Sequence, residues 1–212
     1  MDMPNISYKG DIAKNIFANN DYYQEIAYLK TIEDFIDYES YSKFISAIER
    51  LVRTSNDYKV FIDYIKNTIG INFCQVLSQI HDKVDANIEF HHGPIFTLYD
   101  ICENELNKFI QTGKRINSFR IADAVLDLHF DLKVNGVMLC KTMHESAHNQ
   151  DLFINIDQSL GDVNSYIQEY HHYFSPEVKY KLWNYIQMCK NNPSFDKGVL
   201  DIENVSSYIK CA

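Results

Sequence analysis

The stretch that decides the fold class reads Asn135-Gly-Val-Met-Leu-Cys140-Lys-Thr-Met-His144-Glu-Ser-Ala-His148. Its first half is a short apolar segment typical of a strand, and the periodicity that follows predicts a helix over roughly 141–149. His144 and His148 are four residues apart, so on a helix they share one face, with Cβ atoms about 5–6 Å apart. Two imidazoles placed in this way can bind one metal ion, although such a pair can equally be a polar helix face.

A second histidine pair, His91-His92, ends another β-prone segment. The segments 71–80 and 86–91 are short and partly alternating in polarity, which predicts a hairpin that Gly93-Pro94 terminates. Adjacent residues of an extended segment point to opposite faces, so one histidine can face a metal while its neighbour faces water.

The rest of the chain favours helix, since only 7 Gly and 4 Pro interrupt it. Apolar residues at three- and four-residue spacing predict two or three helices between about residues 21 and 66, with breaks at 38–41 and 54–57. Further helices are predicted over 97–112 and 117–130. The tail from Asp162 onward is amphipathic, with boundaries at Ser175-Pro176 and at 191–193.

Composition and charge limit the function classes. Apolar residues make up 46% and charged residues 23% of 212 residues, which is typical of a soluble globular protein, and no apolar run approaches the roughly 20 residues of a membrane span. Neither a secretory signal nor a cysteine framework is visible, which predicts a cytoplasmic protein. The net charge is −9 and is spread evenly along the chain, which counts against an extensive phosphate-binding surface.

Together these motifs resemble the signature of HNH (ββα-metal) endonucleases, in which an Asn precedes a short apolar strand, Leu-Cys, and the His that opens the metal helix. The interval from Asn135 to His144 and the following His-x₃-His resemble in particular the DNase domains of colicin-type toxins, whose motif also begins with His-His. The stretch 88–156 is similar to a family of tailed-phage proteins of unassigned activity. The residues that carry this likeness are His91-His-Gly-Pro-Ile-Phe-Thr-Leu-Tyr-Asp-Ile101, Leu128-His129, Leu139-Cys-Lys-Thr-Met-His-Glu-Ser-Ala-His-Asn149 and Phe153-Ile154.

The resemblance implies a role for each residue of the motif. His91, His144 and His148 would bind one divalent cation (Zn²⁺, Mg²⁺, Mn²⁺ or Ni²⁺). His92 would be the general base that activates water, and Asn135 would hold the loop that orients His92. A histidine with a pKa near 6.5 suits proton transfer near neutral pH.

The resemblance also implies an architecture: an α+β, mostly helical fold with an HNH-like ββα-metal core. We expect an N-terminal helical region (1–70), a core (71–158) with a helical insertion (97–130), and a C-terminal helical region (159–212). His92 and Asn135 are farther apart than in compact HNH motifs. Either the two helices are inserted within the ββα element, or Asn135 is not the HNH asparagine and the site is built differently.

The predicted activity is metal-dependent hydrolysis of phosphodiester bonds, in DNA rather than RNA, by a phage-encoded protein in the cytoplasm of its bacterial host. Weak DNA binding would depend on five basic residues near the motif: Lys114, Arg115, Arg120, Lys133 and Lys141. Two alternatives remain. The protein can be a non-catalytic factor that binds a host or phage protein and holds a structural zinc, or a metal hydrolase acting on another substrate.

Overall fold

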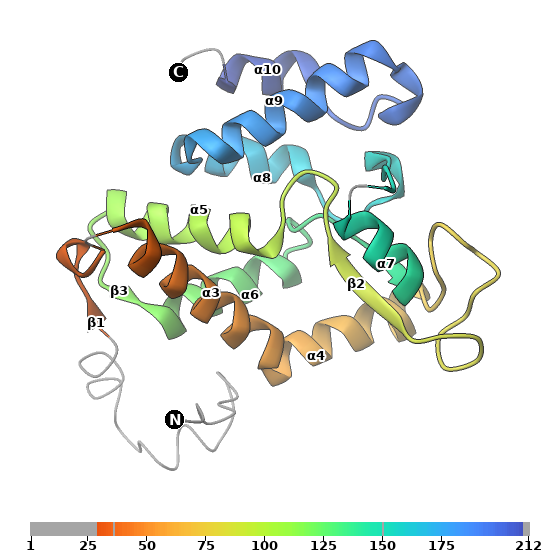
Figure 1. Ribbon diagram of the computed structural model, residues 1–212, viewed down its shortest axis with the longest axis horizontal. Helices are drawn as coiled ribbons and strands as arrows, with labels where there is room; N and C mark the ends of the chain where they lie inside the picture. Colours follow the sequence, from red (N-terminus) through yellow and green to blue (C-terminus); the bar gives the residue numbers. More distant parts are fainter. Residues whose placement is uncertain (1–28, 36, 150, 210–212) are drawn as a thin grey trace. The chain divides into compact units, whose positions relative to one another are not determined.

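The computed structural model describes residues 29–35, 37–149 and 151–209. Most of these residues are helical, and the strands form two small antiparallel sheets (Figure 1). The predicted α+β, mostly helical fold class is therefore confirmed. The chain divides into two compact units, which are described separately. The described residues of the first unit are 29–35, 37–61 and 98–130, and those of the second are 62–97, 131–149 and 151–209.

The helices and strands have the following bounds. The α-helices are α3 (Tyr38–Thr54), α4 (Asn56–Asp63), α5 (Leu98–Gln111), α6 (Ser118–Phe130), α7 (Lys141–His148), α8 (Val163–Tyr170), α9 (Pro176–Asn191) and α10 (Ile202–Ile209). The strands are β1 (Leu29–Lys30), β2 (Ile88–His92), β3 (Ile116–Asn117) and β4 (Gly136–Cys140). The short helices are η1 (Ile32–Asp34), the π-helical η2 (Tyr64–Ile69), η3 (Ile156–Gln158), η4 (His171–Tyr173) and η5 (Pro193–Phe195).

In the first unit, α3, α5 and α6 pack against one another. α3 buries Ile45, Ile48 and Val52, whose spacing places them on one face. The predicted break at residues 38–41 is wrong. Asp37 caps the helix by accepting a hydrogen bond from the Ser40 backbone N–H (2.7 Å), so these residues form the first turn. The predicted helices before residue 29 lie outside the described residues.

The two helices predicted between the histidine motifs, over 97–112 and 117–130, are confirmed as α5 and α6. Near the end of α6, His129 is fully buried. Its ring packs edge-on against Tyr58 and Phe61, and its Nδ1 lies 2.7 Å from the carbonyl oxygen of Val125. Burial lowers the pKa of His129 to about 4, because the charged imidazolium would lose its hydration. The histidine is therefore a neutral part of this core near pH 7.

The second unit is built around the antiparallel pair β2 and β4, in which Ile88 lies opposite Cys140 and His92 opposite Gly136. The hairpin predicted between residues 71–80 and 86–91 is wrong, because β2 pairs with β4 and the earlier segment forms only isolated bridges, such as Phe73 with His81. All five residues of β4 are buried, so β4 offers a wholly apolar partner that the mixed segment 71–80 does not.

The outer edge of β4 is occupied as well. The Met138 N–H donates to the Gln75 side-chain oxygen (2.7 Å), and the Gln75 N–H donates to the Met138 carbonyl (2.8 Å). The Gln75 side-chain amide donates to the Gln158 carbonyl (2.7 Å). Gly136 exchanges backbone hydrogen bonds with Leu160 in the same way. These contacts satisfy polar groups that an open strand edge would leave unpaired.

Replacing Gln75 with alanine should lower the free energy of unfolding by about 1–3 kcal/mol, because it leaves the buried N–H of Met138 without its acceptor. Urea denaturation of the full chain measures this loss. Gln79→Ala, at an exposed position in the same loop, is the matched control and should change stability by less than about 0.5 kcal/mol. Equal effects of the two substitutions would show that the edge of β4 does not depend on Gln75.

The C-terminal part of the second unit consists of α8, α9 and α10. The predicted boundaries at Ser175-Pro176 and at 191–193 are confirmed: the Ser175 side chain accepts from the Val178 N–H, and α9 ends at Asn191. The predicted C-terminal region thus belongs to the same compact unit as β2, β4 and α7. In the described part of the chain, every helix falls short of the length or apolar content that crossing a membrane requires.

Candidate metal centre

β2 and α7 bring three histidines together in the second unit. His91 comes from β2, and His144 and His148 come from successive turns of α7, which lies against both strands (Figure 1). Their possible ligand atoms all lie within 4.8 Å of one another. The Nε2 atoms of His144 and His148 are 3.2 Å apart, and the His91 ring centre is 5.1 and 5.0 Å from theirs.

This donor set fits one divalent metal ion. A tetrahedral ion bound at about 2.0–2.1 Å places neighbouring nitrogens about 3.3 Å apart, close to the separation of the two α7 histidines. The nitrogen of His91 lies within 4.8 Å of the other two, so a shared ion would require the three side chains to draw closer together. Exposure increases from His91, which is buried, through His144 to the exposed His148, so one side of the site faces solvent.

A carboxylate orients one of the three imidazoles. Glu89 lies two residues before His91 on β2, and its Oε2 is 2.8 Å from the Nδ1 of His144. A carboxylate that accepts a hydrogen bond from one ring nitrogen fixes the tautomer and turns the other nitrogen toward a metal. Sequence reasoning missed Glu89. Glu145, the residue next to His144, lies 3.8 Å from Lys141 on the exposed side of α7. Side chains alternate between the two faces of a strand, so residues 89 and 91 share one face of β2. This alternation was the feature of the sequence that could have identified Glu89.

Glu89→Ala should weaken metal binding about 10–100-fold, as removal of such outer partners typically does. Glu89→Gln, which keeps an oxygen acceptor, should cause a smaller loss. Isothermal titration with Zn²⁺ measures both. Glu145→Ala removes a glutamate from the same region without touching His144 and should leave the affinity unchanged. If both alanine variants bind Zn²⁺ like the unaltered protein, Glu89 does not orient His144.

The two residues predicted to act in catalysis flank the same strand pair. His92 lies on the opposite face of β2 from His91, with its ring edge-on to Phe90 at 5.0 Å. The Asn135 carbonyl accepts a hydrogen bond from the Gly93 N–H (3.2 Å), so Asn135 fastens the start of β4 to the end of β2. The Asn135 side chain is 2% exposed, and its amide nitrogen has no hydrogen-bond partner among the described residues.

The long interval between His92 and Asn135 corresponds to α5, β3 and α6, which the chain inserts between two strands that still pair. The inserted helices belong to the first unit, together with α3. β2 is therefore far from β4 and α7 in the sequence but lies next to them in the structure. The pairing shows that α5 and α6 lie between two paired strands, whereas the role of Asn135 as the HNH asparagine stays a prediction.

The five predicted basic residues divide between the two units. Lys114, Arg115 and Arg120 lie in the first unit, where the Lys114 ammonium sits 5.1 Å from the centre of the Phe109 ring. Lys133 and Lys141 lie in the second unit with the histidines.

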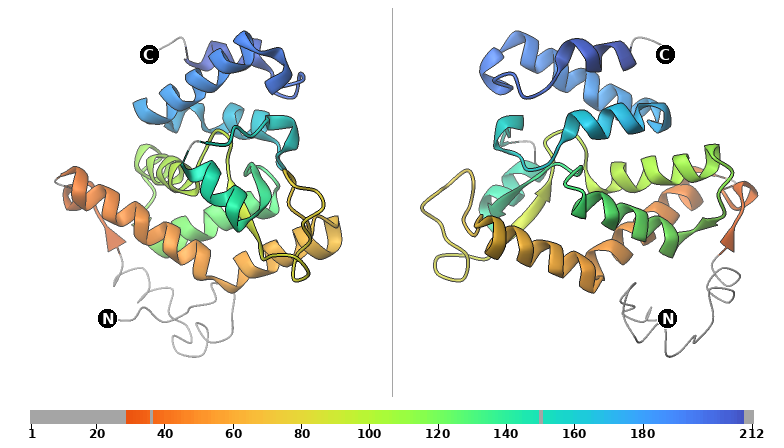
Figure 2. Two further views of the ribbon diagram at one scale, coloured as in Figure 1. Left: turned by 45° about the vertical axis from the view of Figure 1, so that its right-hand side comes forward. Right: turned by 180° about the vertical axis from the view of Figure 1, so that it is seen from behind.

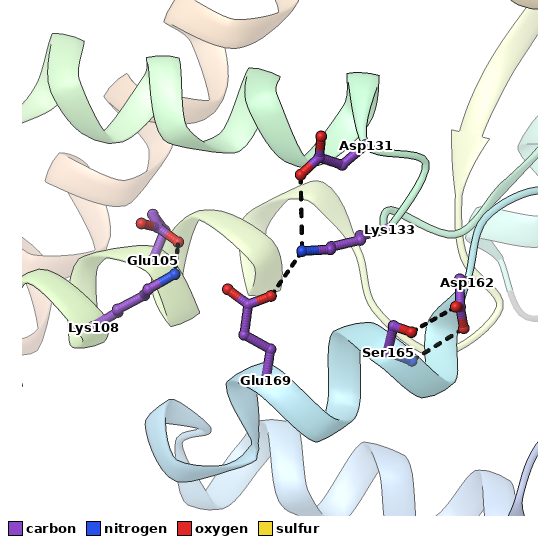
Figure 3. Close-up of polar contacts among 7 residues, drawn as sticks. All are labelled: Glu105, Lys108, Asp131, Lys133, Asp162, Ser165 and Glu169. Carbon is purple, nitrogen blue, oxygen red and sulfur yellow. Dashed lines mark hydrogen bonds and ion pairs between the residues drawn. The ribbon is translucent and has the colours of Figure 1, made fainter.

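Lys133 is already engaged by two carboxylates. Figure 3 shows its ammonium between Glu169 (2.8 Å) and Asp131 (3.8 Å). The hydrogen bond with Glu169 raises the pKa of Lys133 above its ordinary value. In the same view Ser165 donates to Asp162 at the start of α8, and this lowers the pKa of Asp162. Lys133 thus ties the loop before Asn135 to α8, and its charge is largely neutralised.

The chain matches a family of bacteriophage proteins over almost its whole length. The family is described as Bacteriophage G278-like virion protein, and its model matches residues 4–210. No curated protein and no solved structure matches the chain. The predicted phage origin is confirmed by this match, whereas the HNH assignment stays a prediction. Since far more than half of its residues are matched, the chain belongs to the bacteriophage G278-like virion protein family.

Proposed function

We propose that this virion protein is a metal-dependent nuclease of the HNH type that hydrolyses phosphodiester bonds, with DNA as its substrate. The observation that carries the proposal is the convergence of His91, His144 and His148 from a strand and the helix that follows its partner strand. The antiparallel pair, the helix and the three imidazoles agree with the ββα-metal arrangement that the sequence resembles.

The division of labour follows from the position of each residue. His91, His144 and His148 would hold a divalent ion, which would supply Lewis-acid stabilisation of the negative charge on the scissile phosphate. His92 lies on the other face of the same strand end, where it is 5% exposed, and would accept the proton of the attacking water. Asn135 keeps the ends of β2 and β4 together through its carbonyl, and so fixes the position of His92 relative to His91.

The exposure of the site supports catalysis over a purely structural ion. Structural zinc sites are closed by four protein ligands, whereas catalytic sites keep a position for water or substrate. Here three histidines converge, and the third of them, His148, is exposed. A phosphate group would reach the three imidazoles from the side of His148.

A structural role is the second candidate, and two observations favour it. The family is one of virion proteins, and the chain carries a net charge of −9 with no basic region. In this alternative the ion fastens α7 to β2, and the protein contributes to the particle through contacts with other proteins. Metal binding alone does not distinguish the candidates, because both require it.

Cleavage distinguishes them. Purified protein is loaded separately with Zn²⁺, Mg²⁺, Mn²⁺ and Ni²⁺ and incubated with supercoiled plasmid, and the ion is located by anomalous scattering. The nuclease proposal expects nicking of the plasmid and an ion bonded to all three histidines. An ion at this position with no cleavage of DNA or RNA under any metal supports the structural role. An ion bound elsewhere contradicts both candidates.

DNA binding should be weak and only shallowly dependent on salt. The slope of log K against log[salt] is about −0.9 per phosphate contact, so two to four contacts from the five predicted basic residues give a total slope of about −2 to −4. Fluorescence anisotropy with labelled duplex DNA between about 50 and 200 mM salt measures the slope. Lys114→Glu with Arg115→Glu should weaken binding and leave Zn²⁺ uptake intact. If the double variant binds DNA as tightly as the unaltered protein, these residues take no part in substrate binding.

A further inference from the structure

The outer face of α9 presents two aromatic side chains to solvent. Tyr180 is 63% exposed and Trp183, the single tryptophan of the chain, is 46% exposed. Their rings are nearly parallel, with centres 6.1 Å apart. Exposure of two large aromatic rings to water is unfavourable, and a binding partner that covers them removes this cost. Tryptophan and tyrosine are also enriched among the residues that dominate the binding energy of protein interfaces.

A pocket of about 180 Å³ adjoins Trp183, between α9 and α10. Figure 2 shows these two helices next to each other in both views. The residues that line the pocket are Trp183, Ile186, Gln187, Lys190, Ser206 and Ile209. An apolar cavity of about 150 Å³ is large enough for benzene, so this pocket can hold one aromatic ring or one branched aliphatic side chain.

The polar groups of the pocket favour a partner that accepts hydrogen bonds. Lys190, Gln187 and Ser206 can all donate, and none of the six lining residues is acidic. The Ser206 hydroxyl is buried and has no hydrogen-bond partner among the described residues. A carboxylate at the mouth of the pocket would supply the acceptors.

The charge of this face differs from that of the chain. Lys179 and Lys190 stand four residues before and seven residues after Trp183, so all three lie on one face of α9. Neither lysine forms an ion pair with a described residue, although the chain has 29 acidic residues. By contrast, Lys133 and Lys197 in the same unit are both paired with carboxylates. Two unpaired cations on either side of an exposed tryptophan are complementary to an acidic partner.

We propose that the α9–α10 groove, defined as Tyr180 and Lys179 together with the six pocket residues, is a docking site for an acidic segment of another polypeptide. One apolar side chain of that segment enters the pocket, and its carboxylates lie against Lys179 and Lys190. Membership of a virion protein family supports this occupant, because a virion component assembles with other protein chains. The docking site is independent of the metal centre, since it uses none of the residues assigned there.

Single-stranded nucleic acid is the competing occupant, since it too stacks on aromatic rings and binds cations. Two features favour the polypeptide. The pocket is walled by Ile186 and Ile209 and accommodates a side chain, whereas a site that follows a phosphate backbone needs a run of closely spaced cations. The two lysines are eleven residues apart, or about 16 Å along the helix, with no cation between them on that face.

The test uses the full chain and labelled twelve-residue peptides of Asp and Glu with Phe, Leu or Ile at every third or fourth position. Two control peptides carry Ser in place of the apolar residues or Lys in place of the acids. We expect at least one apolar acidic peptide to bind saturably in fluorescence anisotropy and to shift the emission of Trp183, and neither control peptide to bind. Trp183→Ala, and Lys179→Glu with Lys190→Glu, should each weaken binding at least 10-fold.

Matched control variants separate this site from general attraction. Lys59→Glu reverses an exposed lysine of α4, and Tyr38→Ala removes a tyrosine that is 78% exposed; neither should change peptide affinity. The proposal is overturned if no apolar acidic peptide binds, or if Lys59→Glu weakens binding as much as the α9 reversals. It is also overturned if an oligothymidylate probe binds this face more tightly than every peptide. Self-association abolished by Trp183→Ala, without peptide binding, would replace the proposed partner with a second copy of the chain.

Discussion

His144→Ala should abolish both metal binding and DNA cleavage, whereas His92→Ala should abolish cleavage alone. His144 would supply one of the three proposed ligand nitrogens and is held by Glu89, so its removal leaves two imidazoles on different elements. His92 lies on the opposite face of β2, and its loss leaves the three ligands in place. Loss of a general base typically lowers the rate about 10²–10⁴-fold. Titration with Zn²⁺ and plasmid nicking, performed on the same preparations, measure the two effects.

Two further variants guard against simple unfolding. His92→Asn fills most of the space beside Phe90, so it should be folded by circular dichroism and should still lack cleavage. His81→Ala removes an exposed histidine outside the cluster and should change neither metal affinity nor nicking. Normal cleavage by His92→Asn would eliminate His92 as the base. Normal Zn²⁺ affinity of His144→Ala would eliminate the proposed metal centre, and with it the nuclease.

Acidification should destabilise the first unit by about 3 kcal/mol through His129. The pKa of this side chain is about 4 in the folded chain and about 6.5 when unfolded. Between these values the unfolded chain binds a proton that the folded chain excludes, so stability is complete above pH 6.5 and falls as the pH drops toward 4. Below pH 4 the loss levels off. Urea denaturation at pH 7.5, 6, 5 and 4.5 should follow this course.

The contribution of His129 is isolated by comparison with His129→Gln, which cannot titrate in this range. The variant is expected to be less stable at pH 7.5, because the ring packs against Tyr58 and Phe61, but to lose less stability on acidification. The difference between the two pH dependences is the quantity of interest. A direct titration of the His129 ring by NMR should show no protonation at pH 5.5. A ring that titrates near pH 6.5 would contradict the buried, neutral state.

Features encoded by short-range patterns were predictable from the sequence. The spacing of apolar residues located α5 and α6, the pair Ser175-Pro176 located the start of α9, and the interval between His144 and His148 placed two imidazoles on one helix face. Each of these depends on residues within a few positions of one another, where helix geometry fixes the distances. The convergence of His91 with the α7 pair required the likeness to a known motif, because no local rule relates residue 91 to residue 144.

Features that depend on distant partners were missed. The segment 71–80 was assigned to β2 because it is nearby and β-prone. β4 is the better partner, because all residues of β4 and every residue of β2 except Glu89 are buried. Gln75 is a polar residue of a type that is common in loops, yet its side chain accepts a hydrogen bond from the outer edge of β4. Glu89 was not recognised because its partner, His144, is 55 positions away. In each case, burial and pairing across the fold decided the outcome, and neither is visible in a window of ten residues.

The insertion of α5 and α6 between β2 and β4 has a consequence for the order of events during folding. A tight hairpin would let the two strands meet almost at once, whereas residues 93–135 must first be brought into a closed loop. For a flexible chain this closure costs about 3 kcal/mol more than a two-residue turn. If the inserted helices have already packed against α3, most of the loop is no longer flexible. Much of the free-energy cost of loop closure then no longer opposes pairing of the strands. The three histidines of the proposed metal centre would then come together late, and a weakened first unit would delay metal uptake although it contains none of them.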